Sequence, residues 1–136
     1  MPVSYISLIA AAIASMVVGS VWYGPLFGKT FQKAAGMDKW SAEKQAEEKK
    51  KMGKLYFMQL IASLVMFYVL ALFIAERGDL SVSSGISTAL LAWVGFVVPV
   101  QFGSAIWGGS MTLFWIGAGN MLVTLLAAGA IIGALG

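Results

Sequence analysis

Long uncharged apolar segments alternate with short polar ones along this chain. A helical crossing of a bilayer needs about 20 apolar residues. The uncharged stretch from Leu80 to Gly136 is therefore too long for one crossing and suits two, divided at the glycines and serines of residues 103–110. The four predicted spans are about 3–23, 55–75, 82–102 and 111–132. This pattern predicts an all-α integral membrane protein, with residues 1–136 forming one transmembrane domain that folds as a compact four-helix bundle.

Two alternatives to this layout stay open. In the first, three segments cross the bilayer and one is re-entrant, which is tolerated only where the re-entrant backbone is buried in protein. In the second, the first segment is a cleaved signal peptide, although no basic residue precedes its apolar run and the run is long for that purpose. In the third predicted span, Pro99 is expected to kink the helix.

Charge is concentrated in the connection between the first two spans, residues 29–54. This loop carries a net charge of +4, whereas the second charged group, residues 76–79, carries −1. Short loops rich in lysine are retained on the cytoplasmic side of a membrane. We therefore expect a multi-pass protein of the cell (inner) membrane, with the Lys29–Lys54 loop cytoplasmic and both termini outside.

The charged loop has the pattern of a short solvated helix. Ser41 is a suitable N-cap for a helix beginning at Ala42, and Glu47 and Lys51 have the spacing of a helical ion pair. The helix is either separate from the second span or continuous with it, with Gly53 as a joint. Binding of anionic lipid by the lysines is a further possibility. The four interleaved acidic residues favour a role in topology instead.

Composition excludes several classes of function. Hydrophobic residues make up 60% of the chain and charged residues 11%, against about 25% charged in soluble domains. The chain has no cysteine and no histidine, and no acidic residue within a predicted span. Nucleophilic, acid–base and metal sites all lack parts, so we expect no enzyme, no catalytic residue, no cofactor and no metal. The basic residues are mixed with acids in one segment, so we expect no nucleic-acid partner.

Two predicted spans carry polar residues on one helical face. Gln59 and Ser63 are four residues apart, as are Asn120 and Thr124. A polar side chain in hydrocarbon must find a partner, so both pairs are expected to face inward. They form either interhelical hydrogen bonds or a polar pathway for water, an ion or a small solute. Without an acidic residue in a span, the pathway is not a proton relay.

Small residues recur at the spacing that lets helices pack closely. Ser15 and Gly19 form one such pair, and Gly129 and Gly133 form a G-x-x-x-G pair. Either pair suits a contact within one chain or a contact between two chains.

The end of the first span has a distinctive sequence, W-Y-G-P-L-F-G-K. Its candidate interface residues are Trp22, Tyr23, Gly24, Pro25 and Lys29. Gly24 and Pro25 are expected to end the helix, and the aromatic rings suit the headgroup layer. The segment serves either as an anchor at that layer or as a site for a ligand or partner.

This segment, followed by a charged connection and three further spans, resembles the bacterial membrane family of domain of unknown function 1761. The resemblance covers nearly the whole chain in layout, and its specificity rests on Trp22 to Lys29. It implies four helices and a membrane location. It implies no activity.

Two functions remain open. The first is a packing, scaffold or accessory protein that self-associates in the bilayer, with an unidentified membrane protein as a further partner. The second is a small oligomeric channel or transporter for a neutral or anionic solute, not coupled to protons through a membrane carboxylate. A pore needs the polar residues on a continuous wet path, whereas a scaffold needs them paired and dry.

Overall fold

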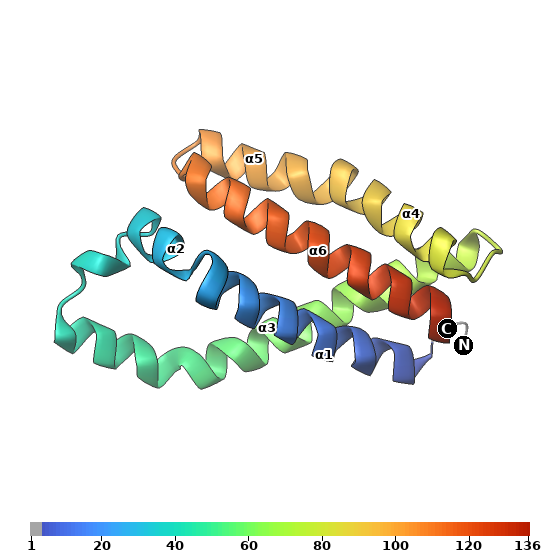
Figure 1. The fold of residues 1–136 in the computed structure, drawn as a ribbon, viewed down its shortest axis with the longest axis horizontal. Helices are drawn as coiled ribbons and strands as arrows, with labels where there is room; N and C mark the ends of the chain where they lie inside the picture. Colours follow the sequence, from blue (N-terminus) through green and yellow to red (C-terminus); the bar gives the residue numbers. More distant parts are fainter. Residues whose placement is uncertain (1–3) are drawn as a thin grey trace.

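The computed structural model describes residues 4–136, and every regular element in that range is a helix (Figure 1). The elements are α1 (Tyr5–Val21), η1 (Trp22–Leu26), α2 (Gly28–Ala34), η2 (Met37–Lys39), α3 (Ala42–Glu76), α4 (Val82–Ala92), η3 (Trp93–Val97), α5 (Val98–Ile106) and α6 (Met111–Leu135). Four continuous helical stretches are long and apolar enough to cross a membrane: Tyr5–Leu26, Ala42–Glu76, Val82–Ile106 and Met111–Leu135. The all-helical prediction is confirmed, and these four stretches indicate a multi-pass membrane protein.

The helices differ in extent from the predicted spans. Residue 3, where the first predicted span begins, lies outside the described residues. The second stretch starts at Ala42, because Ser41 Oγ accepts a hydrogen bond from the Lys44 amide at 3.2 Å, and it runs through Gly53 without a break. The third stretch continues past Gly103 to Ile106 and ends in a turn in which Gly108 has a φ of 147°. Glycine is favoured there because other residues rarely adopt a positive φ.

The central element is α6, which contacts α1, α3, α4 and α5. The chain runs in one direction through α1 and through α4–η3–α5, and in the opposite direction through α3 and α6 (Figure 1). As a result, the start of α1, the α3–α4 turn and the end of α6 lie at one end of the molecule. The opposite end holds α2, η2 and the α5–α6 turn.

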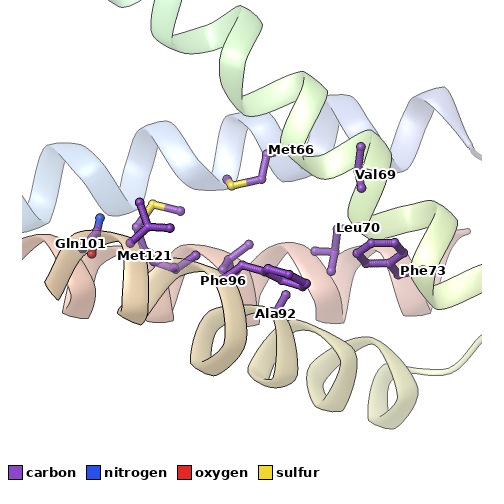
Figure 2. A pocket seen from close by; sticks show the side chains of 11 residues that line it. Met66, Val69, Leu70, Phe73, Ala92, Phe96, Gln101 and Met121 are labelled. Carbon is purple, nitrogen blue, oxygen red and sulfur yellow. The ribbon is translucent and has the colours of Figure 1, made fainter. Parts of the chain in front are cut away.

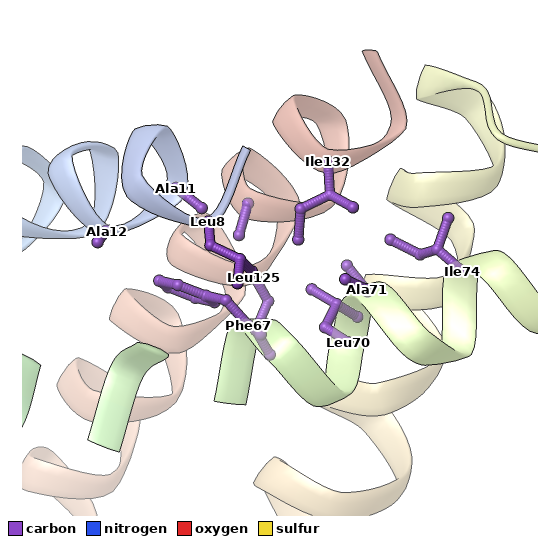
Figure 3. Packing of buried hydrophobic residues seen from close by; sticks show 11 residues of the cluster. Leu8, Ala11, Ala12, Phe67, Leu70, Ala71, Ile74, Leu125 and Ile132 are labelled. Carbon is purple, nitrogen blue, oxygen red and sulfur yellow. The ribbon is translucent and has the colours of Figure 1, made fainter. Parts of the chain in front are cut away.

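The hydrophobic core lies where α1, α3 and α6 meet (Figure 3). Phe67 and Ile74 of α3 are fully buried there, against Leu8 of α1 and Leu125 and Ile132 of α6. Towards its N-terminal half, α3 diverges from the other helices, so its first turns stand apart from α1 (Figure 1). The bundle is therefore close-packed around α6 and more open beside α3.

Glycines bring the backbones of α4 and α6 into close contact. A Cβ atom at Gly129 would overlap the Gly85 carbonyl, and one at Gly133 would overlap the Ser81 carbonyl. The G-x-x-x-G pair of α6 therefore packs within this chain, in the manner of close-packed membrane helices. The other candidate pair does not pack in this way, because Ser15 Oγ donates to the Ala12 carbonyl of its own helix and Gly19 has no neighbour within 4 Å of an added Cβ.

The charged segment forms α2, η2 and the first half of α3. Among residues 4–136 the only ion pair joins Lys51 Nζ to Glu48 Oε1 at 3.8 Å, three residues apart. The expected pair of Glu47 with Lys51 does not form. Glu47 and Lys51 are both exposed, and exposed ion pairs are held too weakly to fix one geometry.

The α4–α6 contact predicts that alanine destabilises the protein at a glycine inside the contact but not at a glycine outside it. Gly129→Ala should lower the free energy of unfolding by about 1–3 kcal/mol, because the added methyl group overpacks the helix interface. Gly53→Ala should leave it unchanged or raise it by up to about 1 kcal/mol, because nothing lies within 4 Å of the new Cβ and alanine favours a helix. Reversible unfolding in detergent measures both. Equal effects of the two substitutions would contradict the close contact.

Candidate functional site

Two tryptophans hydrogen-bond to the backbone of α6. Trp22 Nε1 donates to the Ile116 carbonyl at 2.8 Å, and Trp93 Nε1 donates to the Ala118 carbonyl, also at 2.8 Å. The first indole comes from the α1–η1 stretch and the second from the α4–η3 stretch. The N-terminal third of α6 is thus held by one indole from each of the two helical stretches that run antiparallel to it.

Each of these tryptophans begins a wide π-helical turn. In the first turn the Phe27 amide donates to the Trp22 carbonyl, five residues back, at 2.9 Å. Proline has no N–H and clashes with the carbonyl four residues before it in an α-helix. A wider turn relieves both problems, so the helix continues through Gly24 and Pro25 to Leu26. The expectation that Gly24 and Pro25 end the helix was therefore wrong.

The second π-helical turn, Trp93–Val97, ends two residues before Pro99. The disturbance expected at this proline is thus taken up by the preceding turn. The sequence W-V-G at Trp93 is the counterpart of W-Y-G at Trp22. The two segments share the pattern W-x-G. This pattern was visible in the sequence, but Trp93 was not identified from it as the counterpart of Trp22.

Glycines of α6 make room for the side chains around it. A Cβ atom at Gly119 would lie 2.8 Å from Cζ2 of Trp22, and one at Gly117 would lie 3.7 Å from Nε2 of Gln101. Without side chains at these two positions, the indole and the amide lie close against the helix backbone.

Two amide oxygens near this part of α6 are buried without a hydrogen-bond partner. They are Oε1 of Gln101 and Oδ1 of Asn120. Sequence reasoning selected Asn120 and missed Gln101, although Gln101 is the one amide side chain in the third stretch. Thr124, also selected, is 5% exposed. Two unpaired acceptors in one part of a small bundle mark it as the place where a hydrogen-bond donor is missing.

The polar pair of α3 has a different setting. Gln59 Nε2 donates to Ser63 Oγ of the same helix at 3.3 Å. Ser63 is buried, but Gln59 is exposed and does not face the interior as expected. No side-chain hydrogen bond in the described part of the chain joins this pair to Asn120 or Thr124. The four predicted polar residues therefore do not form one connected site.

Two apolar grooves lie along the sides of α3. The first has a volume of about 410 Å³ and lies between α3 and η3–α5, with α6 behind it (Figure 2). Its lining residues are Met66, Val69, Leu70, Phe73, Ala92, Phe96, Val97, Val100, Gln101, Met121 and Leu125. The second, of about 390 Å³, lies between α1 and α3 and is lined by Tyr5, Leu8, Ile9, Leu64, Val65 and Tyr68. Gln101 is the one amide in either lining.

The rest of the W-Y-G-P segment forms a compact aromatic turn. The Tyr23 and Phe31 rings pack edge to face with centroids 5.0 Å apart, and Gly28 lies so close to Tyr23 that an added Cβ would be 2.7 Å from its carbonyl oxygen. Lys29 is exposed beside this turn. Neither groove is lined by any of the candidate interface residues.

Arg77 was also missed from the sequence. Its Nη1 donates to Ser87 Oγ at 2.7 Å and to Thr88 Oγ1 at 2.8 Å, both on α4. The guanidinium thereby ties the α3–α4 turn to α4 without an acidic partner. Within residues 4–136 no group of three or more acidic side chains gathers closely enough to hold a metal ion.

Comparison with known proteins places these features in a family. A family described as "Protein of unknown function (DUF1761)" matches residues 6–133. The match includes the whole W-Y-G-P-L-F-G-K segment and nearly all of the four apolar stretches, and it confirms the resemblance seen in the sequence. No curated protein and no solved structure matches the chain.

The two indole bonds predict matched effects on stability. Trp22→Phe and Trp93→Phe should each lower the free energy of unfolding by about 1 kcal/mol, because each removes one N–H donor but keeps an aromatic ring. Trp107→Phe is the control, since Trp107 is 89% exposed. Unfolding of the three variants in detergent tests this. A loss at Trp107 equal to the other two would show that the indole bonds to α6 are not responsible.

Proposed function

We propose that this chain, which belongs to the DUF1761 family of proteins of unknown function, is a packing or accessory protein of the cell (inner) membrane that associates with further copies of itself. Its partners in this proposal are the lipid bilayer and a second copy, with an unidentified membrane protein as a further partner. No catalytic step, cofactor or nucleic-acid partner is assigned to this chain.

The surface of the helices supports a bilayer location. Large apolar side chains face outward on all four candidate spans, including Ile6 at 74%, Val65 at 61%, Leu91 at 68% and Trp115 at 68% exposed. An apolar surface of this extent is far larger than the patches that soluble monomers expose. The charged side chains gather at the two ends of the bundle instead.

Charge also supports the orientation. The end that holds α2, η2 and the start of α3 carries the lysine-rich segment, and the opposite end carries Glu76, Arg77 and Asp79. We place the lysine-rich end in the cytoplasm, because positive loops are retained there. Both termini are then outside.

The observation that carries self-association is the pair of grooves beside α3. Only one strip of α3 is buried against the rest of the chain, and its members are Ser63, Phe67, Leu70, Ala71 and Ile74. Helix association in lipid is driven by close packing and by interhelical hydrogen bonds. Side chains of another helix would fill a groove and bring α3 to the packing density of a protein interior.

The alternative of a channel or transporter has less support. A pore needs polar side chains along a continuous path, but the larger groove has one polar side chain, Gln101, in its lining. Gln59 and Ser63 pair within one helix, and no hydrogen bond in the described residues links them to α6. The geometry therefore favours packing over conduction.

Self-association predicts cross-linking from the groove and not from the outer face of α1. The chain has no cysteine, so a single introduced cysteine reports alone. After mild oxidation in native membranes, Val69→Cys, in the groove lining, should give several times more cross-linked dimer than Val17→Cys. Val17 is a matched control because it is 58% exposed and lines neither groove. A higher yield from Val17→Cys would contradict the proposal.

The orientation predicts one-sided labelling. Asp79→Cys should react with a membrane-impermeant maleimide in intact cells, because the α3–α4 turn is placed outside. Asp38→Cys should react only after the cells are permeabilised. Both positions are exposed, so access to the reagent differs only by side. The reverse pattern would overturn the assigned orientation.

A further inference from the structure

We infer that a second copy of this chain binds along α3 in the larger groove, and that Gln59 of one copy hydrogen-bonds Gln101 of the other. This inference rests on the proposed self-association. It names the two residues that would set the register of the contact.

Gln59 lies on the lipid-facing surface of the apolar part of α3. It is exposed, and its bond to Ser63 uses one of its two N–H donors, while a glutamine amide also offers an oxygen with two lone pairs. A glutamine facing hydrocarbon retains a strong demand for a partner. The remaining groups of this amide therefore favour a helix that packs against α3 from outside the bundle.

Gln59 also extends the stripe of α3 that forms the groove wall. Met66 and Phe73, which line the groove, follow Gln59 at intervals of seven residues. Seven residues are close to two helical turns, so these three side chains lie on one face. A polar residue at one position of such a seam specifies register and partner number, at some cost in stability.

Gln101 presents the complementary amide from the other wall of the same groove (Figure 2). Its Oε1 is buried without a hydrogen-bond partner. A half-turn of the terminal amide exchanges its oxygen and nitrogen, so either end can face the groove. One amide can both donate to and accept from another, so Gln59 and Gln101 suit each other chemically.

The two glutamines also lie at matching depths. Measured from the α3–α4 turn, Gln59 lies 17 residues before Glu76, or about 25 Å of helix, and Gln101 lies 19 residues after Val82, or about 28 Å of helix. A second copy in the same orientation, related by a two-fold axis along the bilayer normal, would bring each Gln59 to the level of the other copy's Gln101. This isologous contact contains the amide pair twice.

The test compares dimer dissociation constants in lipid bilayers for the full chain, measured by energy transfer between labelled copies as the protein is diluted. Gln59→Leu and Gln101→Leu should each weaken the dimer about fivefold to tenfold, since two interhelical bonds of modest strength are lost. The double variant should be no weaker than either single variant, because the same bonds are removed. Gln32→Leu, at an exposed glutamine of α2, is the control and should leave the constant unchanged.

A second measurement does not depend on the leucine variants folding normally. When a Gln59→Cys chain and a Gln101→Cys chain are co-expressed, their heterodimer should cross-link more than a Gln59→Cys chain paired with a Gln32→Cys chain. Two results would overturn the amide pair but leave self-association intact. In the first, the wild-type chain dimerises and neither leucine substitution weakens the dimer. In the second, the Gln59→Cys and Gln101→Cys chains show no preferential cross-link. Such a result would place lipid or a different protein in the groove. A monomeric wild-type chain overturns both the pair and the proposed function.

Discussion

Small residues along α6 let the neighbouring helices approach its backbone closely, and the packing of the bundle follows from this approach. Gly129 and Gly133 let α4 lie directly against α6 at one end, and Gly117 and Gly119, in the N-terminal third of α6, leave room for the side chains of Gln101 and Trp22. The indoles of Trp22 and Trp93 then reach α6 carbonyl groups from the two stretches antiparallel to it. Larger residues at the glycine positions would push both stretches away from α6.

This arrangement leaves α3 outside the closest backbone contacts of the bundle. The glycine contacts and indole bonds join α6 to the α1–η1 and α4–η3–α5 stretches, whereas α3 packs through a single strip and has a groove on each side. Exposing such apolar grooves to water would cost free energy, whereas exposing them to lipid does not. An open side of this kind is consistent with a unit that completes its packing by association, and the unpaired amide of Gln101 lies on that side.

The sequence predicted features that depend on local chemistry. The length of the apolar runs located the four spans, and the hydroxyl of Ser41 before an acidic first turn located the start of α3. The G-x-x-x-G spacing identified a close contact on α6 but not its partner, Gly85, which is 44 residues distant.

The helix through Pro25 could not be predicted, because the rule that proline ends a helix is local and the π-helical turn lies beside a distant bond from Trp22 to α6. Gln59 was expected inside because a polar side chain in hydrocarbon must find a partner, but its amide finds one in Ser63 of its own helix.

The mass of the full protein, released from lipid nanodiscs in native mass spectrometry, tests directly whether this chain completes its packing with a second copy. We expect a defined dimer, at twice the 14.4 kDa of one chain. The dimer should lose population when a groove residue such as Val69 is replaced by lysine, since a buried charge opposes the contact. A species of 14.4 kDa alone, at all protein-to-lipid ratios, would contradict self-association.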